Sequence, residues 1–366
     1  MTQNQLDYIP NDIVALEDYE RYAKKIMDKN SLSYVTSGAA DEITMRKNCQ
    51  DFNQIFLEGK PLENLKGAHT KISLFNKEYD SPIMLAPVAY QKLVDSVGEI
   101  NTIRAANALN SCMIVSSFAS STIEEISQNA TAPLWFQLYM QEDMSANLEL
   151  IKKAENLDYE ALVITIDAPI AGIRNKEQRT GFHLPKDISA VNIKKIPISQ
   201  ENNLEGVLSV CNNLPTWDDI EYIKKNTKLP VILKGITSIA YAEKALHLNI
   251  DGIIVSNHGG RTLDTLPSTI EILPKISKAV DKKMKVFLDG GIRRGSDILK
   301  AIALGADAVM IGRPIMYGLA TAGALGVAHT LKILQEELEA SMVFTGCKDI
   351  EKIKKLNIIN NNYHYC

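Results

Sequence analysis

Eight short apolar segments, each followed by a turn and a helical pattern, predict an α/β protein folded as a (β/α)8 TIM barrel. Each segment is almost continuously apolar, as expected for a strand that is buried on both faces of a parallel sheet. Most intervals between the segments are long enough for one helix and two loops. In chain order the predicted strands are PIMLA (82–86), CMIVSS (112–117), LWFQLY (134–139), ALVITID (161–167), PVILKG (230–235), GIIVSN (252–257), KVFLDGG (285–291) and DAVMIG (307–312).

Helical periodicity of about 3.6 residues appears between these strands and predicts the outer layer of the barrel. Eight strands joined in series by such helices favour a closed barrel over an open sheet. The clearest helical segments are STIEEIS (121–127), ANLELIKKAE (146–155), WDDIEYIKK (217–225), AYAEKALHL (240–248) and GSDILKAIAL (295–304).

The length of the chain, 366 residues, fits one barrel with additions, because such a barrel commonly needs about 250 residues. We therefore expect residues 1–366 to form a single domain. Within it, residues 1–80 would be an N-terminal extension, 81–345 the barrel and 346–366 a C-terminal tail.

Two segments are additions to the eight strand–helix units of the barrel. The N-terminal extension should hold a helix in LEDYERYAKKIM (16–27), with a short loop region after it. The interval from Asp167 to Pro230 is too long for one strand-to-helix connection, and its middle is polar and aperiodic. A long excursion of this kind at the catalytic end of a barrel predicts a lid loop over about 175–215.

Composition excludes several classes of function. The formal net charge of −4 provides no basic surface for nucleic acid or an anionic membrane, which favours a small ligand as partner. The N-terminus lacks a signal-peptide core, and no run approaches the roughly 18 apolar residues of a membrane span. Five scattered cysteines without a CxxC pattern predict reduced thiols, a cytoplasmic protein and no metal site.

Polar residues and glycines gather where the predicted strands end. In a barrel, the carboxyl ends of the strands and the loops after them form the active site. The stretch SNHGGR ends the sixth strand with His258 and Arg261 only three residues apart, on a turn with two glycines. Lys234 ends the fifth strand, and Asp167 ends the fourth. This distribution predicts a polar catalytic centre at one mouth of the barrel.

These motifs resemble those of the FMN-dependent 2-hydroxy acid oxidase/dehydrogenase family, which includes glycolate oxidase, lactate oxidase and mandelate dehydrogenase. The resemblance extends over nearly the whole chain, from SYVTSGAADE (33–42) to MVFTGCKDI (342–350). It implies FMN as cofactor, a small 2-hydroxy acid and oxygen as partners, and assembly into a homotetramer. The motifs that carry it are SNHGGRTLD (256–264), LKG (233–235), TIDAP (165–169), WFQLY (135–139) and FLDGGIRRGSD (287–297).

His258 is the predicted catalytic base. Oxidation of a 2-hydroxy acid removes a proton and two electrons from the carbinol carbon, and histidine supplies a base with a pKa near neutrality. Asp167 could orient the imidazole and stabilise the imidazolium, as the aspartate of a catalytic triad does. Taken alone, Asp167 is equally compatible with a helix cap, and the resemblance favours the catalytic role.

Arginine suits the substrate carboxylate because its planar guanidinium can donate two parallel hydrogen bonds. Arg261 lies close enough to the base to hold the carboxylate while His258 reaches the neighbouring carbon. By resemblance, Arg174 supplies a second guanidinium from the long loop. The resemblance also implies that the hydroxyl groups of Tyr139 and Tyr34 contact the substrate, with Tyr139 and Lys234 counted as catalytic.

The electrons need a cofactor, because no side chain accepts a hydride equivalent. A GxGxxG fingerprint after a first strand is absent, so a nicotinamide cofactor is not favoured. GGIRRG and IGRP follow strands seven and eight, where barrels commonly bind phosphate. By resemblance, the FMN-binding residues are Pro87, Val88, Ala89, Ser116, Gln137, Thr165, Lys234, Ser256, Asp289, Gly291, Arg293, Gly312 and Arg313.

Phe118 departs from the family pattern, which usually has tryptophan or tyrosine beside the substrate. A phenyl ring offers no hydrogen bond, so we expect a more open and less polar pocket that admits longer aliphatic or aromatic acids. By resemblance, Ala89 lies at the flavin edge, where alanine rather than glycine favours oxygen as electron acceptor in this family. The alternative is a dehydrogenase that passes electrons to a quinone or another carrier, although the loop 186–210 is too polar for a membrane-docking insert.

Two further readings of the barrel compete with a hydroxy acid oxidase. One is a flavin-binding module that has lost catalysis, and the other is an FMN barrel such as type 2 isopentenyl diphosphate isomerase. Neither a non-catalytic module nor such an isomerase would need a base together with carboxylate-binding and charge-stabilising groups. The chain has this whole set, in His258, Asp167, Lys234 and Arg261, which argues against both alternatives.

Overall fold

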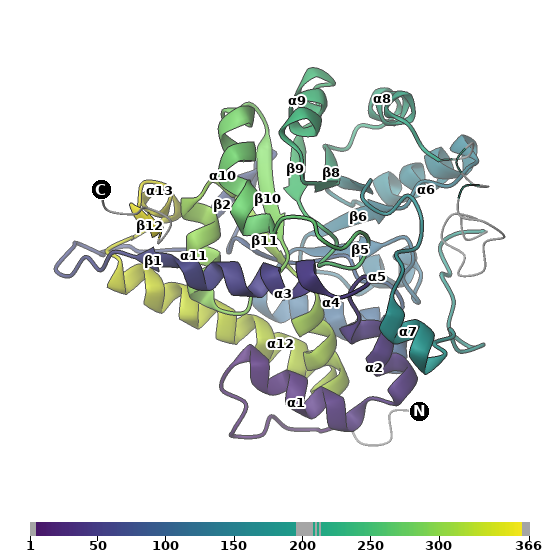
Figure 1. Cartoon of the computed structure of the whole chain (residues 1–366), viewed down its shortest axis with the longest axis horizontal. Helices are drawn as coiled ribbons and strands as arrows, with labels where there is room; N and C mark the ends of the chain where they lie inside the picture. Colours follow the sequence, from purple (N-terminus) through teal and green to yellow (C-terminus); the bar gives the residue numbers. More distant parts are fainter. Residues whose placement is uncertain (1–4, 195–207, 209–210, 212–213, 361–366) are drawn as a thin grey trace.

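A closed barrel of eight parallel strands forms the centre of the molecule, as the sequence predicts (Figure 1). The computed structural model describes residues 5–194, 208, 211 and 214–360. Neighbouring strands follow chain order, and β11 closes the barrel by pairing with β4. The strands are β4 (Ile83–Leu85), β5 (Met113–Ser116), β6 (Leu134–Leu138), β7 (Leu162–Thr165), β8 (Val231–Ile236), β9 (Gly252–Val255), β10 (Lys285–Asp289) and β11 (Ala308–Ile311).

The strands are buried along almost their whole length, which explains their continuous apolar character. Parallel pairing keeps one register from β7 to β8, where Ile164 lies opposite Leu233. Between β8 and β9 the register shifts after Lys234. The shift falls at the carboxyl end of β8, where a bulge can redirect side chains toward a site.

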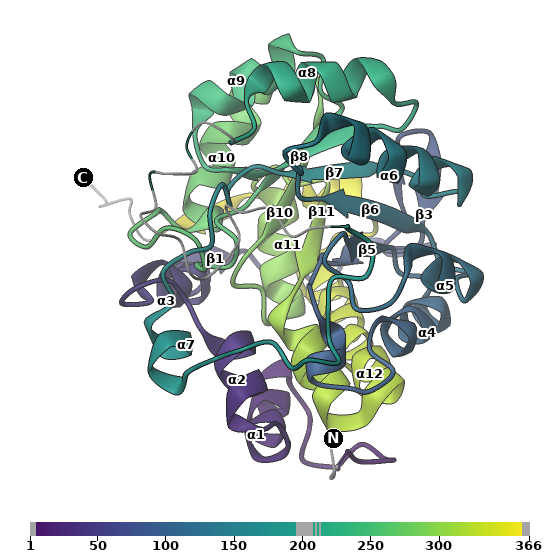
Figure 2. The same ribbon diagram turned by 90° about the vertical axis from the view of Figure 1, so that its right-hand side faces the viewer.

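Helices surround the barrel and cover its strands (Figure 2). Thr122 and Glu125 form a capping box at the start of α5, and Asp143 caps α6. The long helix α12 changes direction at Ala322 and Gly323, which have non-helical dihedral angles. The outer helices are α4 (Glu99–Leu109), α5 (Ile123–Gln128), α6 (Met144–Asn156), α8 (Trp217–Asn226), α9 (Ile239–His247), α10 (Thr269–Val280), α11 (Gly295–Ala303) and α12 (Arg313–Phe344).

The N-terminal extension holds more regular structure than the sequence indicates. The predicted helix is present as α1, and the expected loop region contains two further helices and short strands. The two extra helices have only eight residues each, so tertiary contacts decide whether they form. The elements are α1 (Leu16–Ile26), α2 (Lys29–Thr36), α3 (Ile43–Gln50), β1 (Ile55–Leu57), β2 (Ile72–Leu74) and β3 (Lys77–Tyr79).

The C-terminal tail returns to this extension. Helix α13 (Ile350–Ile353) leads to β12 (Ile358–Asn360), which pairs antiparallel with β1. The first part of the predicted lid forms α7 (Asn175–Thr180), and no helix or strand follows it over 181–194. The remainder of the lid (195–207, 209–210 and 212–213) lies outside the described residues, as do the chain ends (1–4 and 361–366).

Helix α3 is fixed to the loop after β9. The carboxylate of Asp264, the last residue of the SNHGGRTLD motif, accepts backbone N–H bonds from Ile43 and Thr44 at the start of α3, at 3.2 and 2.8 Å. The side-chain amides of Asn48 and Asn257 bond to each other reciprocally, at 2.8 Å in both directions. The extension therefore holds the loop that carries His258.

Candidate active site

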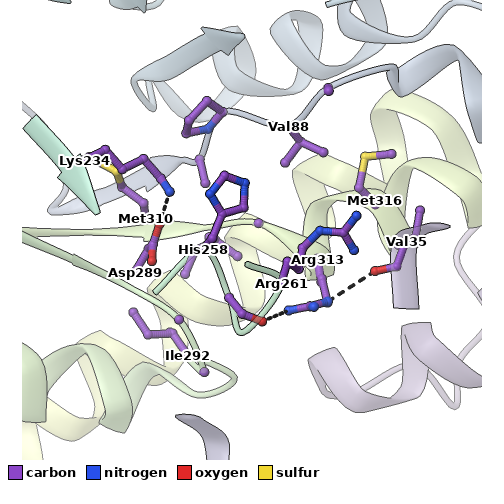
Figure 3. Close-up of a pocket in the computed structure, with 18 of the residues that line it drawn as sticks. Val35, Val88, Lys234, His258, Arg261, Asp289, Ile292, Met310, Arg313 and Met316 are labelled. Atoms are coloured by element: carbon purple, nitrogen blue, oxygen red, sulfur yellow. Dashed lines mark hydrogen bonds and ion pairs between the residues drawn. The ribbon is translucent and has the colours of Figure 1, made fainter. Parts of the chain in front are cut away.

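A cavity opens at the carboxyl ends of the barrel strands (Figure 3). Its volume, including the open mouth, is about 900 Å³. Most of the predicted site residues line it. They are Tyr34, Pro87, Val88, Ala89, Tyr139, Lys234, His258, Arg261, Asp289, Gly291, Arg293, Gly312 and Arg313.

His258 is held from both ring nitrogens. Its Nδ1 lies 2.9 Å from Oδ1 of Asp167, and its Nε2 lies 3.2 Å from the hydroxyl of Tyr139. Because the carboxylate accepts the proton on Nδ1, Nε2 is left as an acceptor to which Tyr139 donates. His258 itself has a φ of 57°, in the left-handed region that non-glycine residues seldom adopt. The backbone of this turn therefore aims the imidazole at the cavity.

The two members of the His258–Asp167 pair have pKa values below their usual ones. For His258, burial lowers the pKa, and the opposing effect of Asp167 does not fully restore it. For Asp167, burial alone would raise the pKa, but His258 and Lys234 hold it below the ordinary value. The carboxylate is therefore ionised and the imidazole is neutral at neutral pH, as a general base must be.

Gly235 makes room for Asp167. A side chain at this position would place its Cβ 2.4 Å from Cβ of Asp167, closer than real Cβ contacts. Its φ of 109° also disfavours any residue with a side chain. The register shift after Lys234 and the glycine that follows it thus allow β8 to pass directly behind the aspartate.

Lys234 is a buried cation, only 4% exposed, at the end of β8. Its Nζ lies 3.2 Å from Oδ2 of Asp289 and donates to Oγ of Ser256 at 3.0 Å. Figure 3 marks the ion pair with Asp289 by a dashed line. Burial would lower its pKa, but Asp289 and Asp167 raise it above the usual value. Lys234 therefore keeps its positive charge in the cavity.

The two predicted arginines meet at one carboxylate. Arg261 donates through Nη1 to the backbone carbonyls of Tyr34 and Ser37, at 2.7 and 2.9 Å. Its Nη2 lies 3.4 Å from Oε1 of Glu177, and Nε of Arg174 donates to the same oxygen at 2.6 Å. The Arg261 guanidinium also lies over the ring of Tyr34, with its Cζ 5.0 Å from the ring centroid.

Arg293 and Arg313 also line the cavity, after β10 and β11. Arg313 donates to the carbonyls of Gly259 and Ser37 at 2.8 and 2.9 Å. Burial, reinforced by Arg261, lowers the pKa of Arg313 to about 10, so the group remains charged at neutral pH. At Gly291, φ is 86° and an added Cβ would lie 2.0 Å from the Asn48 carbonyl oxygen, so only glycine fits.

Three residues predicted to contact the flavin ring form a hydrogen-bonded row across neighbouring strands. Oγ of Ser116 on β5 donates to Oε1 of Gln137 on β6 at 2.8 Å, and Nε2 of Gln137 donates to Thr165 on β7 at 3.0 Å. All three are buried, and none of them lines the cavity. Their mutual bonds fix the side chains just behind its wall.

Phe118 and Arg174 also lie behind the immediate lining of the cavity. Phe118 is 7% exposed and packs against Tyr139, with 4.6 Å between ring centroids, and against Tyr90 at 6.1 Å. It supports the tyrosine that bonds to His258 and adds no polar group. Arg174 is connected to the cavity through Glu177 and Arg261.

Sequence reasoning missed Glu177 and Ser37. The hydroxyl of Ser37 donates to Oε1 of Glu177, and its carbonyl accepts from both Arg261 and Arg313. The spacing of Glu177, three residues after Arg174, is a signal for a helical ion pair. Ser37 carries no such signal, because its part depends on where α2 packs.

Comparison with known proteins assigns this chain to a family. Residues 23–360 match the family model of the FMN-dependent dehydrogenases. A 2-hydroxyacid oxidase from Dictyostelium discoideum is 40% identical over 98% of this chain and 92% of its own length. An L-lactate oxidase from Alicycliphilus denitrificans is 37% identical over 95% of this chain and 96% of its own.

The fold agrees with these sequence matches. A crystal structure of mandelate oxidase with (S)-2-phenylpropionate superimposes with a TM-score of 0.88 at 36% identity, over 95% of this chain and 98% of the other. The family match, on a closed parallel barrel with these strand-end residues, shows a flavin-dependent oxidoreductase. The chain belongs to the FMN-dependent dehydrogenase family, and FMN is its cofactor. The resemblance found in the sequence is thereby confirmed.

The cavity fits FMN on its own chemistry. Oδ1 of Asp289 is buried with no partner among the described residues, so it can accept a bond from a cofactor hydroxyl. Arg293, Arg313 and the backbone of Gly291 offer donors and positive charge to a phosphate. Among the described residues, no group of three or more histidine, cysteine, aspartate or glutamate side chains could hold a metal ion.

Proposed function

We propose that the protein oxidises an L-2-hydroxy acid to the 2-oxo acid, with oxygen as electron acceptor and hydrogen peroxide as second product. The observation that carries this proposal is the placement of His258. Its Nδ1 faces Asp167 at 2.9 Å, and its Nε2 faces the cavity that Arg261 also lines. A base and a carboxylate-binding group therefore lie in one pocket, as a small hydroxy acid requires.

His258 takes up a substrate proton at Nε2, and Asp167 stabilises the imidazolium that results. The depressed pKa of the imidazole keeps it neutral before substrate binds. Lys234 holds a fixed positive charge nearby, where negative charge develops during the reaction. FMN, when bound, accepts the two electrons.

The substrate carboxylate binds to Arg261 and Arg174. Burial raises the pKa of Tyr139 and of Tyr34, so both phenols are protonated and can donate hydrogen bonds to the substrate. Tyr139 already bonds to Nε2 of His258, so it would bring the substrate hydroxyl next to the base. Binding by several fixed donors places the carbinol carbon for reaction.

The cofactor phosphate would be held by Arg293, Arg313 and the amide of Gly291, at the position where barrels commonly bind phosphate. Asp289 would meet the sugar-alcohol chain through its unpaired oxygen. The remaining predicted contacts come from three sources. The lining residues are Pro87, Val88, Ala89, Lys234 and Gly312, the hydrogen-bonded row supplies Ser116, Gln137 and Thr165, and Ser256 bonds to Lys234.

The central test is an anaerobic titration of the purified yellow protein. One L-2-hydroxy acid should bleach the flavin bands, and oxygen should restore them. His258→Gln should keep the cofactor and lose about 10²- to 10⁴-fold in the rate of bleaching. His247→Asn, at an exposed histidine on α9, is the matched control and should react normally. Unchanged bleaching in His258→Gln would instead favour a non-catalytic flavin module.

The side chain of the substrate is the second point to settle. Phe118 gives the wall behind Tyr139 an apolar surface with no hydrogen-bond donor, which supports longer aliphatic or aromatic acids. Turnover of L-lactate, glycolate, L-2-hydroxyoctanoate and L-mandelate should be compared. Strict preference for glycolate would contradict the proposed breadth.

The identity of the electron acceptor follows from reoxidation. Ala89 lines the cavity, and the relatives named above are oxidases, which supports oxygen. Stopped-flow mixing of the substrate-reduced protein with oxygen should restore the flavin within the time of a turnover. Reoxidation that takes minutes would favour a dehydrogenase with another carrier.

The assembly, compartment and domain limits belong to the same proposal. We expect a homotetramer in the cytoplasm, with residues 1–366 as one domain. The free thiols of Cys49, Cys112, Cys211 and Cys347 support a reducing compartment. None of the helices in the described part of the chain has the length and apolar character needed to cross a bilayer. Light scattering after size-exclusion chromatography would give the assembly directly.

A further inference from the structure

An acidic residue lies inside the part of the site that should bind an anion. Glu177, in the first turn of α7, is only 6% exposed. Its Oε1 accepts from Nε of Arg174 at 2.6 Å and from the hydroxyl of Ser37, and lies 3.4 Å from Nη2 of Arg261. A buried carboxylate beside two carboxylate-binding groups competes with the ligand for them, so its presence needs a reason.

One reason is geometric. Glu177 bonds to Arg174 through Nε and contacts only Nη2 of Arg261, whose Nη1 is fixed by the carbonyls of Tyr34 and Ser37. The bond at Nε leaves both terminal amino groups of Arg174 uncommitted to the glutamate. Helices α2 and α7 lie side by side in both views, so the pair is fixed between two packed elements (Figures 1 and 2).

The second reason is charge. Arg174 and Arg261 carry two positive charges, and Glu177 carries one negative charge, which leaves a net charge of +1. One substrate carboxylate would neutralise this group of three side chains. Of the other cations that line the cavity, Lys234 pairs with Asp289, whereas Arg313 has no carboxylate partner among the described residues and donates to the same Ser37 carbonyl as Arg261. Glu177 therefore lowers the positive charge around the two carboxylate-binding arginines by one unit.

We propose that Glu177 is a positioning residue that sets the spacing of Arg174 and Arg261 and, through its charge, selects monocarboxylates over dicarboxylates. This inference rests on the proposed function, because it takes the two arginines as the carboxylate-binding groups. The negative charge of Glu177 repels a second carboxylate on the substrate and so offsets part of the attraction from the arginines.

Two substitutions separate position from charge. Glu177→Gln keeps a carbonyl oxygen within reach of both arginines and removes the negative charge. Glu177→Asp keeps the charge and shortens the side chain by one methylene group, so it cannot reach both guanidiniums as well. Glu160→Gln is the matched control. Glu160 is a partly buried glutamate that accepts hydrogen bonds from Tyr79 and Lys77. It lies just before β7, at the end of the barrel opposite the cavity.

The experiment measures binding of two inert ligands, succinate and succinamate, to the oxidised holoenzyme at pH 7.5 by perturbation of the flavin absorption spectrum. They have nearly the same shape and differ by one charge, so positional effects cancel in the ratio of their Kd values. At an effective dielectric of about 20, one charge at roughly 12 Å changes a binding constant about tenfold. Relative to a variant without this charge, Glu177 should therefore shift the ratio of the succinate Kd to the succinamate Kd about tenfold in favour of succinamate.

Glu177→Gln should lose this discrimination by about tenfold, and Glu160→Gln should keep it. Glu177→Asp should keep the ratio, weaken both ligands, and raise KM for a 2-hydroxy acid with kcat within about threefold, since His258 and Asp167 are untouched. An unchanged ratio in Glu177→Gln overturns the inference. If that variant does not retain FMN, Glu177→Asp decides instead, and unchanged Kd and KM values in it overturn the inference.

Failure of the proposed function has a different signature. In that case no 2-hydroxy acid bleaches the flavin of wild type. A wild type that is bleached normally, together with an unchanged Kd ratio in Glu177→Gln, refutes only the role of Glu177.

Discussion

Replacing Asp167 by asparagine removes the negative charge that faces Nδ1 of His258 at 2.9 Å. The substitution preserves the size of the side chain and leaves an oxygen that can still accept the Nδ1–H bond. It therefore tests the charge of Asp167, with the position of the imidazole largely retained. The carboxylate-binding contacts of Arg261 lie elsewhere in the cavity and should not change.

The size of the effect follows from the geometry. With charge centres roughly 4 Å apart and an effective dielectric of about 20, the pair is worth about 4 kcal/mol once the imidazole is protonated. Since each 1.36 kcal/mol is a factor of ten in rate, the loss approaches 10³-fold. The hydrogen bond that asparagine retains offsets part of it, so we expect kcat to fall about 10²- to 10³-fold with KM within about threefold.

Anaerobic stopped-flow reduction of the flavin by saturating substrate measures this rate directly. Asp307→Asn serves as control, because Asp307 precedes β11 at the opposite end of the barrel, where it accepts from Val286 and pairs with Lys354. The control should reduce at the wild-type rate. A loss of less than tenfold in Asp167→Asn, with the cofactor retained, would refute the reasoning that Asp167 stabilises the charged imidazole.

Two further predictions come from the same pair. Burial lowers the pKa of His258, so kcat/KM should fall only when pH drops below the ordinary histidine value of about 6.5. Asp167→Asn removes the carboxylate that raises the pKa of His258, so the acid limb of its pH–rate profile should move to still lower pH. A pH–rate profile of each protein checks these two expectations. An acid limb above pH 6.5 would contradict them. Gly235→Ala should lower both Tm and kcat, because its Cβ would lie 2.4 Å from Cβ of Asp167 at a φ of 109°. Thermal unfolding and turnover measure this, and Gly181→Ala is the control, since its φ is also positive but no atom lies within 4 Å of the added Cβ.

Local patterns in the chain were sufficient to predict the barrel. Continuous apolar runs specify strands buried on both faces, and the helical periodicity between them specifies the outer layer. Because the carboxyl ends of barrel strands form the active site, His258, Lys234 and Arg261 were predicted to lie at one mouth of the barrel. The structure brings the three together there. Family resemblance was needed to pick Tyr34 and Tyr139 out of 13 tyrosines.

Short elements were less predictable from sequence. Helices α2 and α3 have eight residues each and depend on distant partners, such as the carboxylate of Asp264 at the start of α3. Isolated helices of this length are unstable in water, so their local sequences carry a weak signal. The prediction of a loop region after α1 was therefore wrong. The helices found there support the loop after β9 that carries His258.

The sequence by itself determined the strands, the order of the barrel and the residue types at its mouth, because burial and periodicity act over neighbouring residues. Only the tertiary structure decided that Glu177 joins Arg174 to Arg261, that Ser37 binds two arginines, and that the Ser116 row lies behind the cavity wall. Such contacts join residues far apart in the chain. They form only once packing has fixed the distances between α2, α7 and the strand ends.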